Sequence, residues 1–416
     1  MRLYYVELRR QLKTKSVSIL IAIGFLLTLV LSYLPISYIE YTYESDNGTT
    51  VSVSGIEAIR MRKAAWEEYT GKIEPEKIAA ALMQYQEALR QYGEDGIFTG
   101  DMPASEYYEK IAPIYRWIYR LREVYANPQT GSAAEIGNLS EQEALEFYDQ
   151  CYQRLDALMS MEQQEHPSAI SQAQQMYGNV EMPFIYYPGV DGAVIDYMVF
   201  LIVFLVIIGV IIAAPVFSSE YQTGSDQILR CTKHGMHKLA STKVKVTLSI
   251  VTALYIICTL IFFIIVNTAL GWDGCKTSIQ VAFSATCFLP INFGQIQIIT
   301  MVAGLFALLA SVCLVLLLSS KLNTVYTTTV IALLLCFVPM ILNAVFSGNI
   351  GMWIRCLFPT GGVGLSNSFF YELIDINFIY AGSISIWIPF ALLGFSIIEI
   401  PIWSALTFRS YIKHQV

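Results

Sequence analysis

Six long apolar runs are the feature that most constrains how this chain can fold. They cover residues 17–37, 194–217, 246–270, 297–319, 325–346 and 382–407. A helix of roughly 20 residues crosses the ~30 Å hydrocarbon core of a bilayer, so each run is long enough to span a membrane. Hydrophobic residues make up 55% of the chain and charged residues only 14%, a balance typical of membrane proteins. We therefore predict an all-α membrane protein with six transmembrane helices.

The positive charges of the short loops predict which side of the membrane each loop faces. Residues 1–16, the segment 218–245 and the two short segments after the fourth and sixth runs together carry 13 Lys and Arg residues. The loops 271–296 and 347–381 carry one each. Cytoplasmic loops are enriched in Lys and Arg. Both termini are therefore expected in the cytoplasm, and residues 38–193 outside the cell.

Residues 38–193, between the first two runs, are expected to form an extracellular helical domain. Apolar side chains recur there every three or four residues, as on one face of a helix. The three stripes are Ile78, Leu82, Tyr85, Leu89 and Tyr92; Ile111, Ile114, Ile118, Leu121 and Tyr125; and Leu145, Tyr148, Tyr152, Leu155 and Met159. Ser140, with Glu143 three residues later, has the pattern of a helix start. We expect a bundle of three or four long helices.

The charge of this domain bears on its ligand. Residues 38–193 hold 11 Lys and Arg against 25 Asp and Glu, whereas the rest of the chain is net positive, so nucleic acid is not an expected partner. Acidic groups and 16 tyrosines would suit a cationic, amphipathic ligand such as an antimicrobial peptide. Alternatively, the tyrosines form helix seams and the carboxylates only keep the domain soluble.

Enzyme chemistry finds no support in the motifs. "GWDGCKT" at 271–277 resembles a phosphate loop only faintly, because Cys275 stands where glycine must precede the lysine. His234 and His237 have no Cys or carboxylate at ligand spacing, so no metal site is expected. We expect neither a catalytic residue nor a cofactor on this chain.

The spans carry almost no charge. The third, fourth and fifth runs have none, and Asp196 and Glu399 are the exceptions elsewhere. A carboxylate inside a membrane bundle is a candidate for a transport path. Glu399, beside Pro401, can be read in that way or as a side chain simply held by neighbouring helices. The bundle lacks an energy source of its own.

The two loops expected outside the cell, 271–296 and 347–381, each have one further feature. The segment 347–381 is apolar and aromatic, so we expect it to dip back into the membrane as a re-entrant loop, where protein must cover it. Cys275 and Cys287 share an external loop, and whether they form a disulfide stays open.

The segment after the second run is basic and punctuated by glycine. Ser218 or Ser219 could cap a short helix beginning near Glu220. The sequence "APVFSSEYQTGSDQILRCTKHGMHKLASTKVK" resembles the stretch after the second span of ABC-2 type transporter permeases, particularly those of Gram-positive bacteria. The matching positions are Pro215, Phe217, Glu220, Tyr221, Gly224, Asp226, Leu229, Thr232, Lys233, Gly235, Lys238, Leu239 and Lys243. The six spans and the basic N-terminal segment add to the resemblance, which is weak over residues 38–193.

This resemblance implies a division of the chain. Residues 1–16 would form a cytoplasmic interfacial helix bearing Arg9, Arg10 and Lys13, and residues 17–37 the first span. Residues 194–416 would form the remaining five spans. Residues 218–238 would be a coupling helix that docks into an ATPase subunit. Its family positions are Glu220, Tyr221, Gly224, Asp226, Leu229, Lys233, Gly235 and Lys238.

The function implied is that of the permease subunit of an ATP-driven exporter in a plasma membrane. Its partners would be two ATPase subunits, which hold ATP and magnesium, and a second permease, identical or paralogous. The substrate would be amphipathic: an antimicrobial peptide, a drug or a lipid-like molecule. The alternative is a membrane sensor whose extracellular domain binds a ligand without transport. An ATPase that co-purifies would separate the two.

Overall fold

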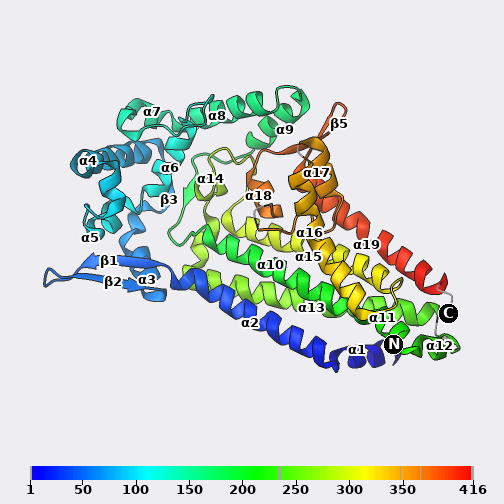
Figure 1. Ribbon diagram of the computed structural model, residues 1–416. Coiled ribbons are helices and arrows are strands. Elements are labelled where there is room, and N and C mark those ends of the chain that lie inside the picture. The colour runs from blue at the N-terminus through cyan, green and yellow to red at the C-terminus, as the bar shows by residue number, and fades with distance from the viewer. Residues whose placement is uncertain (1, 233–235, 347, 366, 414–416) are drawn as a thin grey trace.

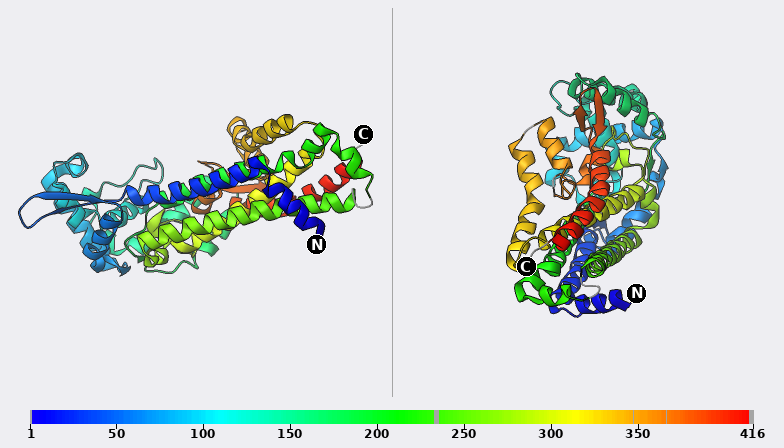
Figure 2. Two further views of the ribbon diagram at one scale, coloured as in Figure 1. Left: turned by 90° about the horizontal axis from the view of Figure 1, so that it is seen from below. Right: turned by 90° about the vertical axis from the view of Figure 1, so that its right-hand side faces the viewer.

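The computed structural model describes residues 2–232, 236–346, 348–365 and 367–413. The molecule is elongated, and its long helices run side by side along its length (Figures 1 and 2). Both termini lie at one end, which we call the terminal end. The segment between the first two long helices, which we call the inserted domain (residues 38–192), lies at the other end.

Within the described residues, six helices are long and apolar enough to cross a membrane, as the six runs predict. They are α2 (Lys15–Ser37), α10 (Ala193–Ala213) with its continuation α11 (Pro215–Thr223), α13 (His237–Leu270), α15 (Phe293–Ser319), α16 (Val325–Val345) and α19 (Ile388–Lys413). The short α1 (Arg2–Leu12) precedes them, and α12 (Ser225–Arg230) stands between α11 and α13. The third helix is longer than its apolar run because it takes in the basic residues before 246.

Helix α10 is the centre of the bundle. Two thirds of its apolar window, 67%, is buried, against 17% for α16. It contacts α2, α13, α15 and α16, which surround it. Large apolar side chains on α16, such as Leu334 and Met340, stay exposed. Lipid tails are as apolar as leucine, so such a surface suits a helix that faces the bilayer.

The inserted domain is mostly helical, as expected. Most residues of its three apolar stripes are buried or partly buried, but Tyr152 of the third stripe is exposed, at 43%. Its longer helices are α3 (Ile56–Ala65), α4 (Pro75–Thr99), α6 (Tyr115–Val124), α8 (Phe147–Glu162) and α9 (Pro167–Tyr177). The shorter α5 (Ala104–Glu106) and α7 (Glu141–Leu145) join them. Ser140 caps α7 in a reciprocal pair with Glu143, as the sequence predicts.

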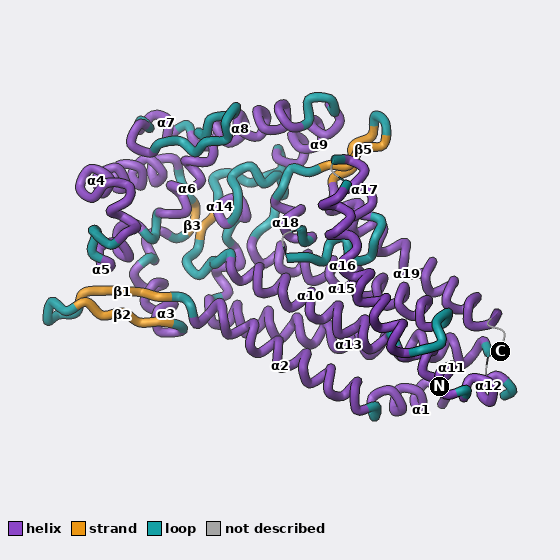
Figure 3. Tube along the Cα trace, viewed as in Figure 1, coloured by secondary structure: helices purple, strands orange, loops and turns teal. Residues whose placement is uncertain are grey.

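Strands in this domain were not expected. Strands β1 (Glu40–Glu44) and β2 (Thr50–Ser54) form an antiparallel hairpin that extends from the end of α2, and β3 (Gly71–Lys72) pairs with β4 (Ile185–Tyr186). Figure 3 shows how little of the chain they occupy. The hairpin follows from alternating polar and β-branched or aromatic residues around Asn47-Gly48, a turn signal that helix periodicity does not detect.

The segment expected as a re-entrant loop folds into a compact unit against the bundle. It contains α17 (Asn349–Cys356), α18 (Phe369–Ile374) and the hairpin of β5 (Phe378–Ala381) and β6 (Ile384–Trp387). Arg355 of α17 and Glu372 of α18 form a buried ion pair at 2.6 Å. Its helices contact α15, α16 and α19.

Cys275 and Cys287, which lie between α13 and α15, make different contacts. Cys275 Sγ donates to Asn267 Oδ1 of α13, whereas Cys287 Sγ donates to the Ile374 carbonyl. Both are free thiols in the structure. Between them, the short α14 (Ile279–Ala282) packs against α6 of the inserted domain.

Candidate functional site

The second span does not stop where the apolar run ends. Pro215 stands at the first turn of α11, where its missing N–H is tolerated, and α11 carries the span on to Thr223. Ser218 therefore lies inside a helix, and its hydroxyl donates to the Ala214 carbonyl at 2.8 Å. The prediction that Ser218 or Ser219 caps a helix beginning near Glu220 is wrong, because Glu220 lies in the interior of α11.

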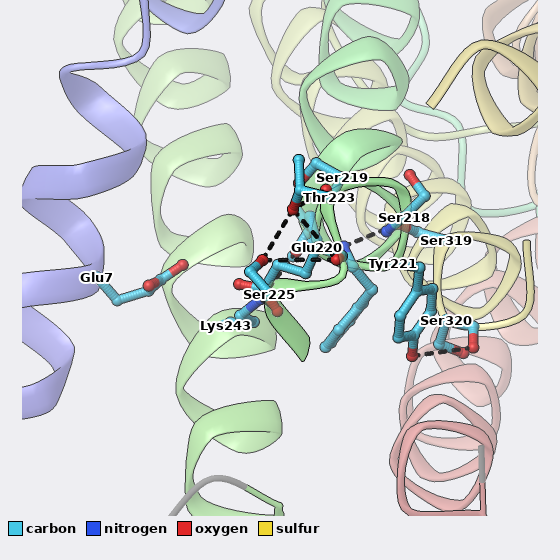
Figure 4. Close-up of polar contacts among 12 residues, drawn as sticks. Glu7, Ser218, Ser219, Glu220, Tyr221, Thr223, Ser225, Lys243, Ser319 and Ser320 are labelled. Carbon is cyan, nitrogen blue, oxygen red and sulfur yellow. Dashed lines mark hydrogen bonds and ion pairs between the residues drawn. The ribbon is translucent and has the colours of Figure 1, made fainter. Parts of the chain in front are cut away.

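Glu220 is the centre of a buried polar cluster. Its carboxylate forms an ion pair with Lys243 of α13, and both side chains are buried, at 4% and 0% exposure. Lys243 Nζ also donates to the Val216 carbonyl at 3.0 Å and lies 5.2 Å from the centre of the Phe217 ring. Figure 4 shows Lys243 directed at Glu220. Two oppositely charged groups thus fasten α11 to α13.

The amphipathic helix α1 joins the same cluster. Arg10 reaches the other oxygen of Glu220 at 3.5 Å and holds Glu7 through hydrogen bonds of 3.0 and 2.6 Å. Partial burial acts to lower the pKa of Arg10, but the hydrogen bond from Glu7 and the charges of Glu7 and Glu220 outweigh it and raise that pKa. The guanidinium therefore stays charged. Gln11 extends the contact, because Thr247 of α13 donates to its side-chain oxygen at 3.3 Å.

The fourth span holds α11 from the opposite side. Ser319, at the end of α15, accepts the backbone N–H groups of Phe217 and Ser218 at 3.0 and 3.1 Å and donates to the Ala214 carbonyl at 2.7 Å. Tyr221 donates to the Ser320 carbonyl at 3.3 Å. We call this set of Glu7, Arg10, Glu220, Lys243 and Ser319 the α11 hub. It ties the base of the second span to α1, α13 and α15.

Beyond the hub the chain turns outward. Gly224 adopts a left-handed conformation, with φ of 67°, that ends α11 and begins α12. An added Cβ at Gly224 would meet nothing within 4 Å, so the requirement for glycine is conformational rather than steric. On α12, Ile228 is 75% exposed. Helix α12 therefore projects at the terminal end, directly after a firmly held helix (Figure 1).

The predicted coupling residues differ in how deeply they are buried. Glu220 and Asp226 are buried, Tyr221 and Leu229 are partly buried, and Lys238 is exposed at the start of α13. Arg9, Arg10 and Lys13 are exposed on or just after α1. Lys233 and Gly235 lie outside the described residues. Arg10 of the predicted interfacial helix and Glu220 of the predicted coupling helix come into contact.

Glu399 lies far from the hub in sequence and is buried in α19, at 8% exposure. Its Oε2 makes no hydrogen bond with the part of the chain that the structure describes. A buried polar atom without a partner is costly, so such an atom is a candidate for a functional role. Among the described residues, no three His, Cys, Asp or Glu side chains gather as a metal site would require.

Three members of the hub were not singled out from the sequence. Lys243 matched the family pattern but was not among the predicted coupling residues, and Glu7 and Ser319 had no assigned role. Each has a feature in the sequence: Lys243 lies just before the third apolar run, Glu7 stands three residues before Arg10, and Ser319 ends an apolar run.

A comparison with models of protein families and a search of curated proteins each found no match.

Proposed function

We propose that this chain is the permease subunit of an ATP-driven exporter, in which α12 and the end of α11 receive force from a separate ATPase. The observation that carries this proposal is the α11 hub. A short exposed helix follows directly on a helix that buried ion pairs and Ser319 hold to three other elements. A push on α12 would therefore move the base of the bundle as one body.

The energetics of the hub favour a mechanical role over a purely stabilising one. A buried ion pair contributes little net stability, because desolvation of both charges offsets their attraction. Losing one partner, in contrast, costs about 3–5 kcal/mol, because the other charge remains buried. Such a contact specifies one geometry strongly, which is what a joint between a motor and a bundle requires.

The arrangement in the membrane belongs to the same proposal. The terminal end would face the cytoplasm, where the exposed Arg9 of α1 and Lys13 just after it could meet anionic lipid head groups. The inserted domain would lie outside the cell. Two ATPase subunits would bind ATP and magnesium, and a second permease would complete the transporter.

The substrate path would run along the bundle, and Glu399 is the candidate residue within it. Its unpartnered oxygen, buried among apolar helices, could accept a hydrogen bond from a polar group of an amphipathic substrate. Hydrolysis would remain on the partner, because this chain carries no phosphate loop.

The experiment that tests the proposal is purification of the chain from its native membrane, followed by reconstitution with any ATPase that co-purifies with it. We expect the purified chain alone to hydrolyse no ATP, and the complex to hydrolyse it at a rate that depends on the intact hub. If the chain co-purifies with no ATPase from its native membrane, and a kinase co-purifies instead, the sensor alternative replaces this proposal.

A further inference from the structure

A cavity of about 430 Å³ lies between the inserted domain and the long helices. Its wall includes Ile39, which follows α2, Leu270, the last residue of α13, and Gly189, just before α10. Three spans thus end at this cavity. Gly189 has φ of 104° and packs on the Leu270 carbonyl so closely that a Cβ could not fit, which makes this wall specific to glycine. The volume is in the range of small-molecule sites.

The charge of the cavity is opposite to that of its domain. Four basic side chains line it, and Asp191 is its one acidic lining residue. The basic residues are Arg62, Lys63, Arg116 and Arg120. Residues 38–193 hold 25 Asp and Glu against 11 Lys and Arg. More than a third of the basic residues of an acidic domain therefore gather at one cavity, and a cationic ligand would be repelled there.

Two of these cations hold the domain in place. Arg116 donates to the Val190 and Ala282 carbonyls at 3.0 and 3.2 Å. Arg120 donates to the Phe283 carbonyl and to Glu123. The Nε of Arg120 is nevertheless buried without a hydrogen-bond partner among the described residues.

The other two cations keep free donors. Arg62 uses its Nε to bind the Glu40 carbonyl at 2.8 Å, and its guanidinium carries further donors at the tip. No hydrogen bond or ion pair within the described residues occupies those tip donors or the ammonium of Lys63. Both side chains come from α3 and are half-buried. Gly271 leaves the space that Lys63 fills, because a Cβ there would collide with the ammonium group.

Aromatic rings complete the wall. Arg62 lies 5.3 Å from the ring of Trp66 and 5.4 Å from that of Tyr108, which orient the guanidinium by cation–π contact. Tyr38 and Trp272, close in sequence to the ends of α2 and α13, are 67% and 50% exposed. Tyr and Trp favour the level of lipid head groups. The cavity therefore sits where a head group would lie if these helices span a bilayer.

We propose that this cavity binds the phosphate-type oxyanion of an amphiphile, with Lys63 and the tip of Arg62 contacting the anion and the aromatic wall contacting its less polar part. Arg and Lys are the side chains that proteins use for phosphate. A phospholipid of the adjoining leaflet would present this group at the right depth, and a soluble organophosphate could present the same chemistry from water. Binding requires no ATPase, so this proposal can fail while the exporter proposal stands. The exporter proposal can likewise fail while this one stands.

The test uses the full chain, purified in detergent, and native mass spectrometry to measure lipid binding. Phosphatidylglycerol, which is anionic, is compared with phosphatidylcholine, whose choline cation would be repelled by the basic side chains of the cavity, in the unchanged chain and in Lys63→Gln. Removal of one charged contact to phosphate should weaken binding of phosphatidylglycerol about tenfold. The matched control is Arg60→Gln, because Arg60 lies on the same helix α3 but is exposed and does not line the cavity. The binding result for Arg62→Gln counts only if the Tm of this variant is unchanged, because the Nε of Arg62 also donates to the Glu40 carbonyl.

The proposal predicts a preference for phosphatidylglycerol that Lys63→Gln lowers and Arg60→Gln leaves intact. Displacement of the lipid by millimolar glycerol phosphate would support the oxyanion site and identify a soluble source for its ligand. Equal binding of the two lipids, or an equal effect of Lys63→Gln and Arg60→Gln, would overturn it. The proposal also fails if a cationic peptide binds the unchanged chain more tightly than it binds Lys63→Glu, because charge repulsion predicts the reverse order.

Discussion

Glu220 of α11 and Lys243 of α13 form an ion pair from which water is excluded, and Arg10 of α1 contacts the same carboxylate. Three separate helices therefore meet at one charged group, which lies just before the exposed helix α12 in the chain. This relationship is the structural basis for the mechanical account of the chain.

Breaking this ion pair should destabilise the bundle strongly. We expect Lys243→Met to lower the free energy of unfolding by about 3–5 kcal/mol, because Glu220 stays buried and its remaining ion-pair partner among the described residues is the more distant Arg10. The measurement is the Tm of the purified chain, followed by tryptophan fluorescence. Lys245→Met is the control, because Lys245 is exposed two residues further along the same helix. Equal Tm values for the two variants would contradict the pairing.

Replacing both charges should recover much of this loss. A buried ion pair exchanged for apolar residues of similar size is often neutral in stability, so Glu220→Leu combined with Lys243→Met should be more stable than Lys243→Met alone. ATP-driven activity should stay low in the double variant, because the link through Arg10 is also gone. A double variant with full activity would show that the hub only stabilises the chain.

The effect of a substitution at Gly224 on stability should depend only on how well the new residue adopts the left-handed backbone conformation. Alanine at φ of 67° should cost about 1 kcal/mol, asparagine should cost less, and proline should cost ~3 kcal/mol or more because its φ is fixed near −65°. The Tm values should follow this order, and Gly224→Pro should uncouple ATP hydrolysis from transport. If Gly224→Pro retains transport, the turn between α11 and α12 has no role in coupling.

The sequence predicts the membrane part of the fold well and the hub poorly. Apolar runs locate the spans because a bilayer demands length and hydrophobicity, and both can be counted. The end of α11 has no such signal. Its serines and Glu220 resemble a polar loop in the sequence, whereas in the fold α1, α13, α15 and α16 contact this part of α11.

The inserted domain shows the same limit in another form. Periodicity finds α4, α6 and α8, whose apolar faces repeat along one helix. It does not find the cavity, because Arg62, Arg116 and Gly189 come from separate segments and meet only in the folded domain. Net charge misleads for a related reason, because an acidic total conceals where the basic residues gather.

Glu399 should prove more important for transport than for stability. Because its Oε2 has no partner among the described residues, Glu399→Leu should raise the free energy of unfolding by roughly 1–3 kcal/mol, while ATP-driven transport falls. Thermal unfolding and a vesicle export assay measure the two effects. A lower Tm for Glu399→Leu would mean that the carboxylate stabilises α19.

Labelling of single cysteines tests the arrangement in the membrane. In a cysteine-free background, we expect Asp46→Cys at the tip of the β1–β2 hairpin to react with a membrane-impermeant maleimide in intact cells. We expect Ile228→Cys to react only after permeabilisation, because the basic segments should lie inside. Both side chains are exposed, so burial does not confuse the result. Reaction of Ile228→Cys in intact cells would reverse the orientation.

The most direct test of the account is a photo-crosslinker placed at position 228 in the full chain in its native membrane. Position 56 is the matched control, because Ile56 is also an exposed isoleucine, at 61% against 75%, but lies in the inserted domain. We predict that position 228 becomes covalently joined to a protein whose peptides include a phosphate loop and which an ATP photo-probe labels, and that position 56 does not. Capture of that ATPase from neither position, or equally from both, would contradict the claim that α12 receives force from an ATPase.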